Sequence, residues 1–211
     1  MRVAAQPVSP AEVAREADRA AARAVKAFRA DGQHDLASER YGEIVERHQR
    51  RASRIAFHYL RDAADADDAV QDAFIKAFVN LGTYRDELPF DVWFTKILVN
   101  GCLDRIKSRT RRGRWMIAIE EEGRAAGEAL PPAPEPTPEA QTLAAERRRH
   151  LEAAMAKLPE RQRAVFVLSQ EQGYTSREVS AMTGLKESTV RVHLFRAIRK
   201  LRTLLDTTRD G

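Results

Sequence analysis

The sequence is poor in the residues that form disulfides, metal sites and membrane spans. Its 211 residues include one cysteine, Cys102, which excludes an intrachain disulfide and a cysteine-rich zinc site. The five histidines lack the spacing of metal ligands, so we expect neither a metal nor a cofactor. No apolar run approaches the roughly 18 residues of a membrane span. The N-terminus has no apolar signal segment, and we expect a cytoplasmic protein.

Strand-like alternation is also missing, and apolar residues recur instead at helical spacing. The pattern predicts an all-α chain with helices near 9–30, 39–60, 65–80, 90–111, 139–157, 159–172, 177–183 and 188–205. No glycine-rich phosphate loop, metal cluster or nucleophile elbow is present, which argues against an enzyme.

Charge and proline are unevenly distributed along the chain. The net charge of +5 is composed of +1 over residues 1–38, +3 over 39–114, −5 over 115–145 and +6 over 146–211. Five of the nine prolines lie between Pro131 and Pro138, where they exclude helix and sheet. We therefore predict an N-terminal extension that is partly helical or disordered (1–38), a helical domain (39–114), an acidic linker (115–139) and a second helical domain (140–207).

The second domain has the layout of a helix-turn-helix. A short helix with a capping-box spacing, Thr175 and Glu178, precedes a turn at Gly184 and a longer basic helix. Such a helix presents its non-core face to the major groove, and the alternative is a bundle helix with a solvated basic face. The candidates for base edges or nearby phosphates are Lys186, Glu187, Ser188, Thr189, Val192, His193 and Arg196. Arg191 and Arg199 are candidate phosphate ligands, and Phe195, which lies off the apolar stripe, is a candidate contact to a sugar or a thymine methyl.

Three segments together resemble the extracytoplasmic-function (ECF) group of bacterial sigma-70 family RNA polymerase sigma factors. They are DADDAVQDAFIKAF, TYRDELPFDVWFTKILVNGCLDRIKSR and LPERQRAVFVLSQEQGYTSREVSAMTGLKESTVRVHLFRAIRKLR, and the resemblance covers residues 39–112 and 145–205. It implies a region 2 bundle, which binds the −10 promoter element, and a region 4 helix-turn-helix, which binds the −35 element.

The resemblance implies that the helix near residues 65–80 contacts the β′ clamp helices of core polymerase, and that the β flap is a further contact. The candidate residues are Asp68, Gln71, Asp72 and Ile75. For the acids the alternative is a structural role at a helix N-terminus, where negative charge stabilises the helix dipole.

The resemblance also places the capture of a flipped −10 base in the loop from Leu81 to Phe90. Tyr84 and Arg85 are the candidate stacking and phosphate groups there. On the following helix Trp93, Lys96, Asn100 and Lys107 share a stripe that could follow the −10 strand. One of Trp93 and Phe94 belongs to the core, and we favour Phe94.

The predicted function is that of a sigma factor, which binds core polymerase and directs initiation at promoters. Its expected partners are core RNA polymerase, promoter DNA and an anti-sigma factor, and the acidic linker either enters a nucleic-acid channel or is a spacer. The alternative is a free-standing helix-turn-helix regulator with an N-terminal sensor or dimerisation domain.

Overall fold

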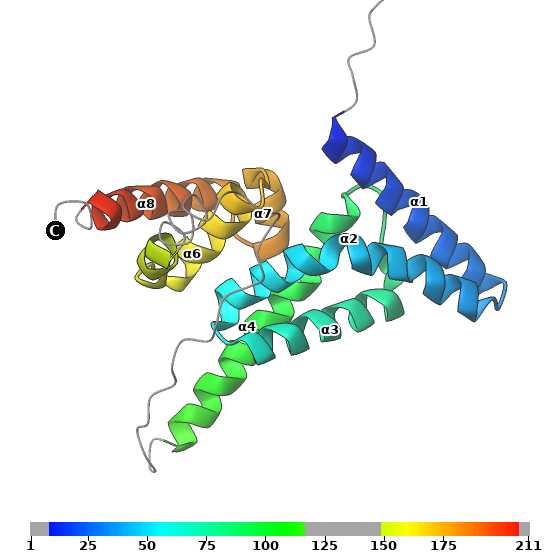
Figure 1. Ribbon diagram of the computed structural model, residues 1–211, viewed down its shortest axis with the longest axis horizontal. Coiled ribbons are helices and arrows are strands. Elements are labelled where there is room, and N and C mark those ends of the chain that lie inside the picture. Colours follow the sequence, from blue (N-terminus) through cyan, green and yellow to red (C-terminus); the bar gives the residue numbers. More distant parts are fainter. Residues whose placement is uncertain (1–8, 117–148, 207–211) are drawn as a thin grey trace, which may run out of the picture.

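The computed structural model describes residues 9–116 and 149–206, and in these ranges the chain is helical and contains no strand (Figure 1). The all-α prediction is therefore confirmed for the described part of the chain. The described helices include none that combines the length and the apolarity required to cross a membrane. Residues 117–139 of the predicted linker lie outside the described ranges.

The N-terminal half contains α1 (Pro10–Ala30), α2 (His34–Leu60), α3 (Ala63–Val79), the short 3₁₀ turn η1 (Leu81–Thr83) and α4 (Phe90–Met116). Helix α2 packs against α1, α3 and α4, so it forms the centre of this half. The core between these helices is rich in aromatic rings, and Phe74 of α3 stacks on Phe94 of α4 with ring centroids 4.4 Å apart. The sequence favoured Phe94 over Trp93 as the core residue, and Phe94 is buried whereas Trp93 is half-buried.

Helix α1 belongs to this fold although it precedes the predicted domain. A capping box between Ser9 and Glu12 starts it, as expected where a serine precedes Pro10 at the first helical turn. Its alanine-rich face at Ala21, Ala22 and Val25 is fully buried against α2. Gly32, with φ of 72°, makes the turn between the two helices, because glycine adopts this left-handed conformation without a steric penalty.

The C-terminal half contains a helical segment at 149–156, α6 (Glu160–Phe166), a π-helical turn η2 (Val167–Glu171), α7 (Ser176–Thr183) and α8 (Glu187–Asp206). Thr175 and Glu178 form the predicted capping box at the start of α7. Gly184, with φ of 72°, ends that helix in the left-handed conformation. Ala197 and Leu201 of α8 pack on Met155, Leu158 and the residues around them in a small separate core.

The two halves are packed against each other through α4 and α7 (Figure 1). The buried residues Tyr174, Val179 and Met182 of the C-terminal half belong to the same apolar cluster as the N-terminal core. Polar contacts reinforce this packing, since Arg163 donates to the His58 carbonyl at 3.1 Å and Nε2 of His58 lies 3.1 Å from a Glu171 carboxylate oxygen. Sequence patterns predicted two modules and gave no indication that they share a core.

Candidate nucleic-acid interface

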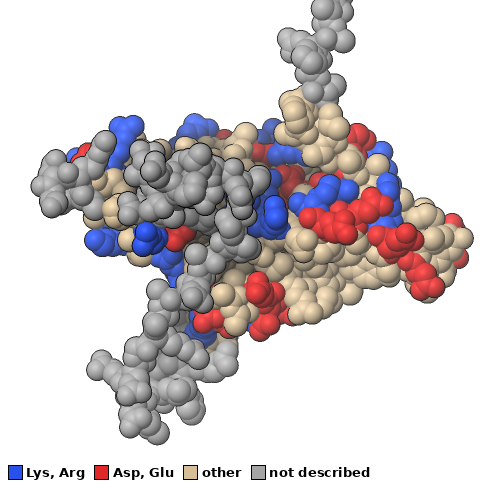
Figure 2. Space-filling model, in the orientation of Figure 1, with Lys and Arg blue, Asp and Glu red and all other residues tan. Residues whose placement is uncertain are grey.

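Helix α8 presents a basic face with exposed apolar side chains in its middle. Val190, Ala197 and Leu201 are buried beneath it, so the periodicity of the helix directs the other residues outward. Phe195 is 67% exposed and Val192 is 46% exposed, and their i,i+3 spacing places the two apolar side chains side by side on the helix surface. In Figure 2 Lys and Arg side chains are visible over the α8 half with a few acidic side chains among them, and the α1 and α2 half has acidic and basic side chains interleaved.

The predicted −35 residues lie on this face or at its N-terminal end. Seven of the ten predicted residues are exposed, and three are half-buried. The exposed ones are Lys186, Ser188, Arg191, Val192, Phe195, Arg196 and Arg199, and the half-buried ones are Glu187, Thr189 and His193. Arg191 forms an i,i+4 ion pair with Glu187 at 3.0 Å, so both side chains already have a partner within the helix.

The predicted −10 stripe also lies on one surface, on α4. Lys96, Asn100 and Lys107 are exposed, and Trp93 is half-buried at the N-terminal end of the same stripe. Lys107 pairs with Asp104 at 3.4 Å, one turn before it. The stripe therefore combines one aromatic ring, one amide and two ammonium groups, a set suited to bases and phosphates of a single strand.

Tyr84 was predicted to stack on a −10 base, but it is buried and only 2% exposed. The ring packs against Phe90 at 5.5 Å and Trp93 at 5.4 Å, and its hydroxyl donates to the Leu88 carbonyl at 3.2 Å. Burial raises the pKa of Tyr84 to about 12. In this conformation the ring has no face available for a base, whereas Arg85 beside it is exposed.

The predicted polymerase-binding residues form one exposed face of α3. Asp68, Gln71 and Asp72 are exposed, and Ile75 is 55% exposed beside Val79 at 61%. The helical period places these side chains opposite the buried Ala69, Ala73 and Ala77 stripe.

The acids at the start of α3 have structural roles as well. Asp62 caps the helix by accepting from the backbone N–H of Asp65 at 2.9 Å, and Asp65 pairs with Arg109. Arg105 of α4 lies 2.5 Å from Asp72 and 3.9 Å from Asp68, so α4 partly neutralises this face.

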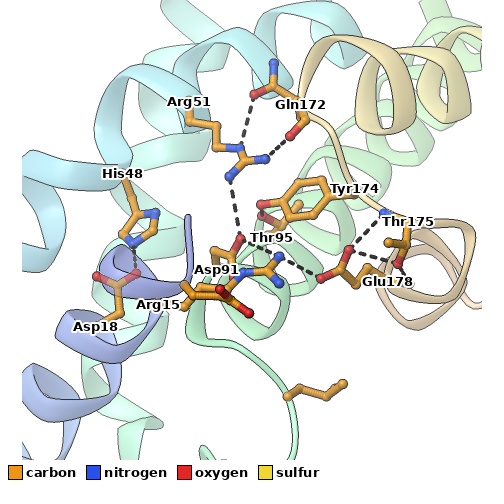
Figure 3. A network of polar contacts seen from close by, with 12 residues as sticks. Arg15, Asp18, His48, Arg51, Asp91, Thr95, Gln172, Tyr174, Thr175 and Glu178 are labelled. Carbon is orange, nitrogen blue, oxygen red and sulfur yellow. Dashed lines mark hydrogen bonds and ion pairs between the residues drawn. The ribbon is translucent and has the colours of Figure 1, made fainter. Parts of the chain in front are cut away.

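A polar network that joins the two halves was not predicted from the sequence (Figure 3). Asp91, in the first turn of α4, is 4% exposed and lies 3.5 Å from a guanidinium nitrogen of both Arg15 and Arg51. Arg51 also contacts Gln172 and lies over the Tyr174 ring at 4.1 Å. These residues come from α1, α2, α4 and the C-terminal half, and no local pattern connects them.

The fold and these surfaces define a two-domain helical protein with a helix-turn-helix, and comparison with known proteins places it in a family. The family model of Sigma-70 region 2 matches residues 44–112, and that of Sigma-70, region 4 matches residues 148–201. The chain is 33% identical over 178 residues to the ECF RNA polymerase sigma factor SigM of Mycobacterium tuberculosis, with 83% of each chain covered. It is 31% identical over 156 residues to the ECF RNA polymerase sigma-E factor of Escherichia coli K12, covering 73% of this chain and 80% of that one.

Two solved structures have a similar fold. The sigma factor RpoE in complex with the anti-sigma factor NepR, from Bartonella quintana, matches with a TM-score of 0.64 at 19% identity, over 79% of this chain and 96% of that one. CnrH in complex with the cytosolic domain of CnrY matches with a TM-score of 0.59 at 24% identity, over 90% and 98%.

The chain belongs to the ECF subfamily of the sigma-70 family, and it is a sigma factor, a transcription initiation factor rather than a classical enzyme. This confirms the resemblance stated from the sequence. The alternative of a free-standing helix-turn-helix regulator is not favoured, because the N-terminal half matches region 2 and not a sensor or dimerisation domain.

Proposed function

We propose that this chain binds core RNA polymerase in the cytoplasm and directs it to promoters with a −35 and a −10 element, which it reads with region 4 and region 2. The observation that carries the proposal is the exposed face of α8. Phe195 and Val192 are exposed there among Arg191, Arg196 and Arg199, a composition suited to a DNA groove.

The α3 face supports the polymerase contact. The exposed Ile75 and Val79 offer an apolar centre, and the neighbouring carboxylates of Asp68 and Asp72 complement a basic partner. We assign this face to the β′ clamp helices, and we retain the β flap as the second polymerase contact, on region 4.

On α4, Trp93 with Lys96, Asn100 and Lys107 is proposed to bind the −10 strand, together with Arg85 of the preceding loop. Tyr84 would join them only after the loop rearranges and releases its ring. Because a solved structure of similar fold is the sigma factor RpoE in complex with the anti-sigma factor NepR, we also propose an anti-sigma factor as a partner.

Run-off transcription with a bacterial core RNA polymerase on a library of promoter fragments tests the proposal. We expect transcripts that appear only when the chain is added and that share two spaced sequence elements upstream of their start sites. Core polymerase alone is the control. If the chain ignores core polymerase and instead protects a palindromic operator as a dimer, the proposal is wrong.

A further inference from the structure

Two basic side chains of α1 hold the loop from Leu81 to Phe90. Nζ of Lys26 donates to the backbone carbonyl of Tyr84 at 2.6 Å and lies 5.3 Å from the centre of its ring. Nε and Nη2 of Arg23 donate to Oδ2 of Asp86 at 2.9 Å and 2.5 Å. Residues three positions apart on a helix are neighbours on its surface, so one face of α1 holds the loop at two points.

The loop is also closed by its own contacts around Tyr84. The Tyr84 hydroxyl donates to the Leu88 carbonyl at 3.2 Å, and its backbone N–H donates to the Leu81 carbonyl at 3.1 Å. Its ring packs against Phe90 and Trp93. Tyr84 is thus fixed through its N–H, its carbonyl, its hydroxyl and its ring, which is the environment of a residue that supports the loop from inside.

The closed loop leaves four consecutive residues exposed, and they are Arg85, Asp86, Glu87 and Leu88. The contact of Tyr84 with Trp93 joins them to the proposed −10 stripe of α4. A surface that is already ordered loses less conformational entropy when it binds, and its fixed groups favour one partner over another. Carboxylates repel phosphates, and Arg23 offsets the charge of Asp86.

We propose that Lys26 and Arg23 of α1 are positioning residues for base selection in the −10 element. They keep the loop closed over Tyr84, so that residues 85–88 meet the −10 strand in one conformation. Lys26 acts through the backbone of Tyr84, and Arg23 acts through Asp86. This inference rests on the proposed binding of the −10 strand, and it deepens that function by assigning base preference in part to a helix that precedes the region 2 match at 44–112.

Run-off transcription with core polymerase on promoters randomised in both elements tests the proposal. Lys26→Met keeps the apolar stem of the side chain and removes the ammonium group. We expect it to lower the preference for the favoured base at one −10 position by about tenfold, because a charge-assisted hydrogen bond is lost, and to leave the −35 preference unchanged. Lys26→Arg keeps a charged donor and should restore most of the preference. For Arg23→Ala we expect a loss of only about twofold, because its ion pair is exposed.

Arg40→Ala is the matched control, because Arg40 forms an ion pair with Glu43 at 2.6 Å within α2 instead of with the loop. It should leave the base preference unchanged at every position.

Hydrogen exchange of the backbone amides of residues 81–90 tests the closed loop in the full chain without polymerase or DNA. We expect slow exchange in the unaltered chain and in Arg40→Ala. In Lys26→Met we expect exchange in this loop to be about tenfold faster, because local opening costs less free energy once the contact is lost.

Three results would overturn the positioning role. They are fast exchange of the loop in the unaltered chain, an unchanged −10 preference in Lys26→Met, and a sharper preference in that variant, which would make the contacts a latch that holds Tyr84 away from a base. Each of these leaves the proposed function intact as long as the unaltered chain supports promoter-specific transcripts. If it supports none, the proposed function fails and this inference fails with it.

Discussion

The two carboxylate oxygens of Glu178 have different partners. Oε2 accepts from the backbone N–H of Thr175 at 2.8 Å and from its hydroxyl at 2.9 Å, while Oε1 accepts from Arg15. Burial opposes ionisation of this side chain, but the hydrogen bonds from Thr175 and the charge of Arg15 hold its pKa below the ordinary value. One residue therefore caps the first helix of the helix-turn-helix and joins that helix to α1.

Thr175→Ala tests the cap alone. The hydroxyl of Thr175 accepts from the backbone N–H of Glu178 at 3.2 Å, and we expect its loss to lower the free energy of unfolding by about 1 kcal/mol. Urea unfolding followed by circular dichroism measures this change. Thr175→Ser keeps the hydroxyl and should restore most of the stability, whereas an equal loss in both variants would exclude the cap as the cause.

Arg196 is predicted to bind a base edge of the −35 element, and its substitution tests this role. If it pairs with a base edge, Arg196→Ala should weaken promoter binding by about 1–3 kcal/mol and relax preference at one −35 position. Competition binding of the holoenzyme to a −35 library measures both effects. Arg199→Ala is the comparison, since a phosphate ligand should lose affinity equally on all sequences, and the same uniform loss for Arg196 would make it a phosphate ligand too.

At the scale of elements, the helical period alone places the buried and the exposed residues of α3 on opposite faces. Its small buried residues allow close packing on α2 and α4, and its exposed face carries acids around Ile75 and Val79. Because this separation is local, the sequence predicted which residues of α3 face outward.

Asp68→Arg should weaken the affinity for core polymerase by about tenfold or more, because reversing a charge on the face that we propose binds a basic partner introduces repulsion. Glu39→Arg, at an exposed position of α2, makes the same change of charge away from the proposed face and should have little effect. Binding to labelled core polymerase measures both variants. Equal affinities for the two would remove α3 from the interface.

The loop from Leu81 to Phe90 shows that residue type and local position did not suffice to predict exposure. An aromatic residue in a loop is a reasonable stacking candidate, but Tyr84 is covered by α1 and α4. Lys26 of α1 donates to the Tyr84 carbonyl at 2.6 Å and lies 5.3 Å from the centre of the ring. The burial of Tyr84 thus depends on a helix that is about 60 residues away in the sequence.

At the scale of the whole molecule, buried carboxylates connect one helix to another. Asp18 of α1 is 2% exposed and accepts from Arg47 at 2.8 Å, and His48 Nε2 lies 2.8 Å from its other oxygen. Although burial favours the neutral acid, the hydrogen bonds and charges of His48 and Arg47 hold the pKa of Asp18 below its ordinary value of 3.8.

Because the pKa of Asp18 is lowered in the folded chain, we expect the stability of the fold to depend on pH in the acidic range. The contribution of Asp18 is fully present above its ordinary pKa and is lost as the pH falls through its lower value in the folded chain. We therefore expect the free energy of unfolding to decline below about pH 4 and to decline less steeply in Asp18→Asn. Urea unfolding at a series of pH values measures both slopes, and identical slopes would show that other carboxylates dominate.

The sequence by itself determined most of the helices, the capping box and glycine stop of α7, the exposed faces of α3 and α8, and the family. These features depend on residues within a few positions of one another, so periodicity and capping chemistry are sufficient to read them. Only the tertiary structure decided that Tyr84 is buried, that the halves share a core, and that α1 reaches region 4. Arg15 and Glu178 are 163 residues apart, and a contact over that separation is set by how the helices pack together, which no local pattern records.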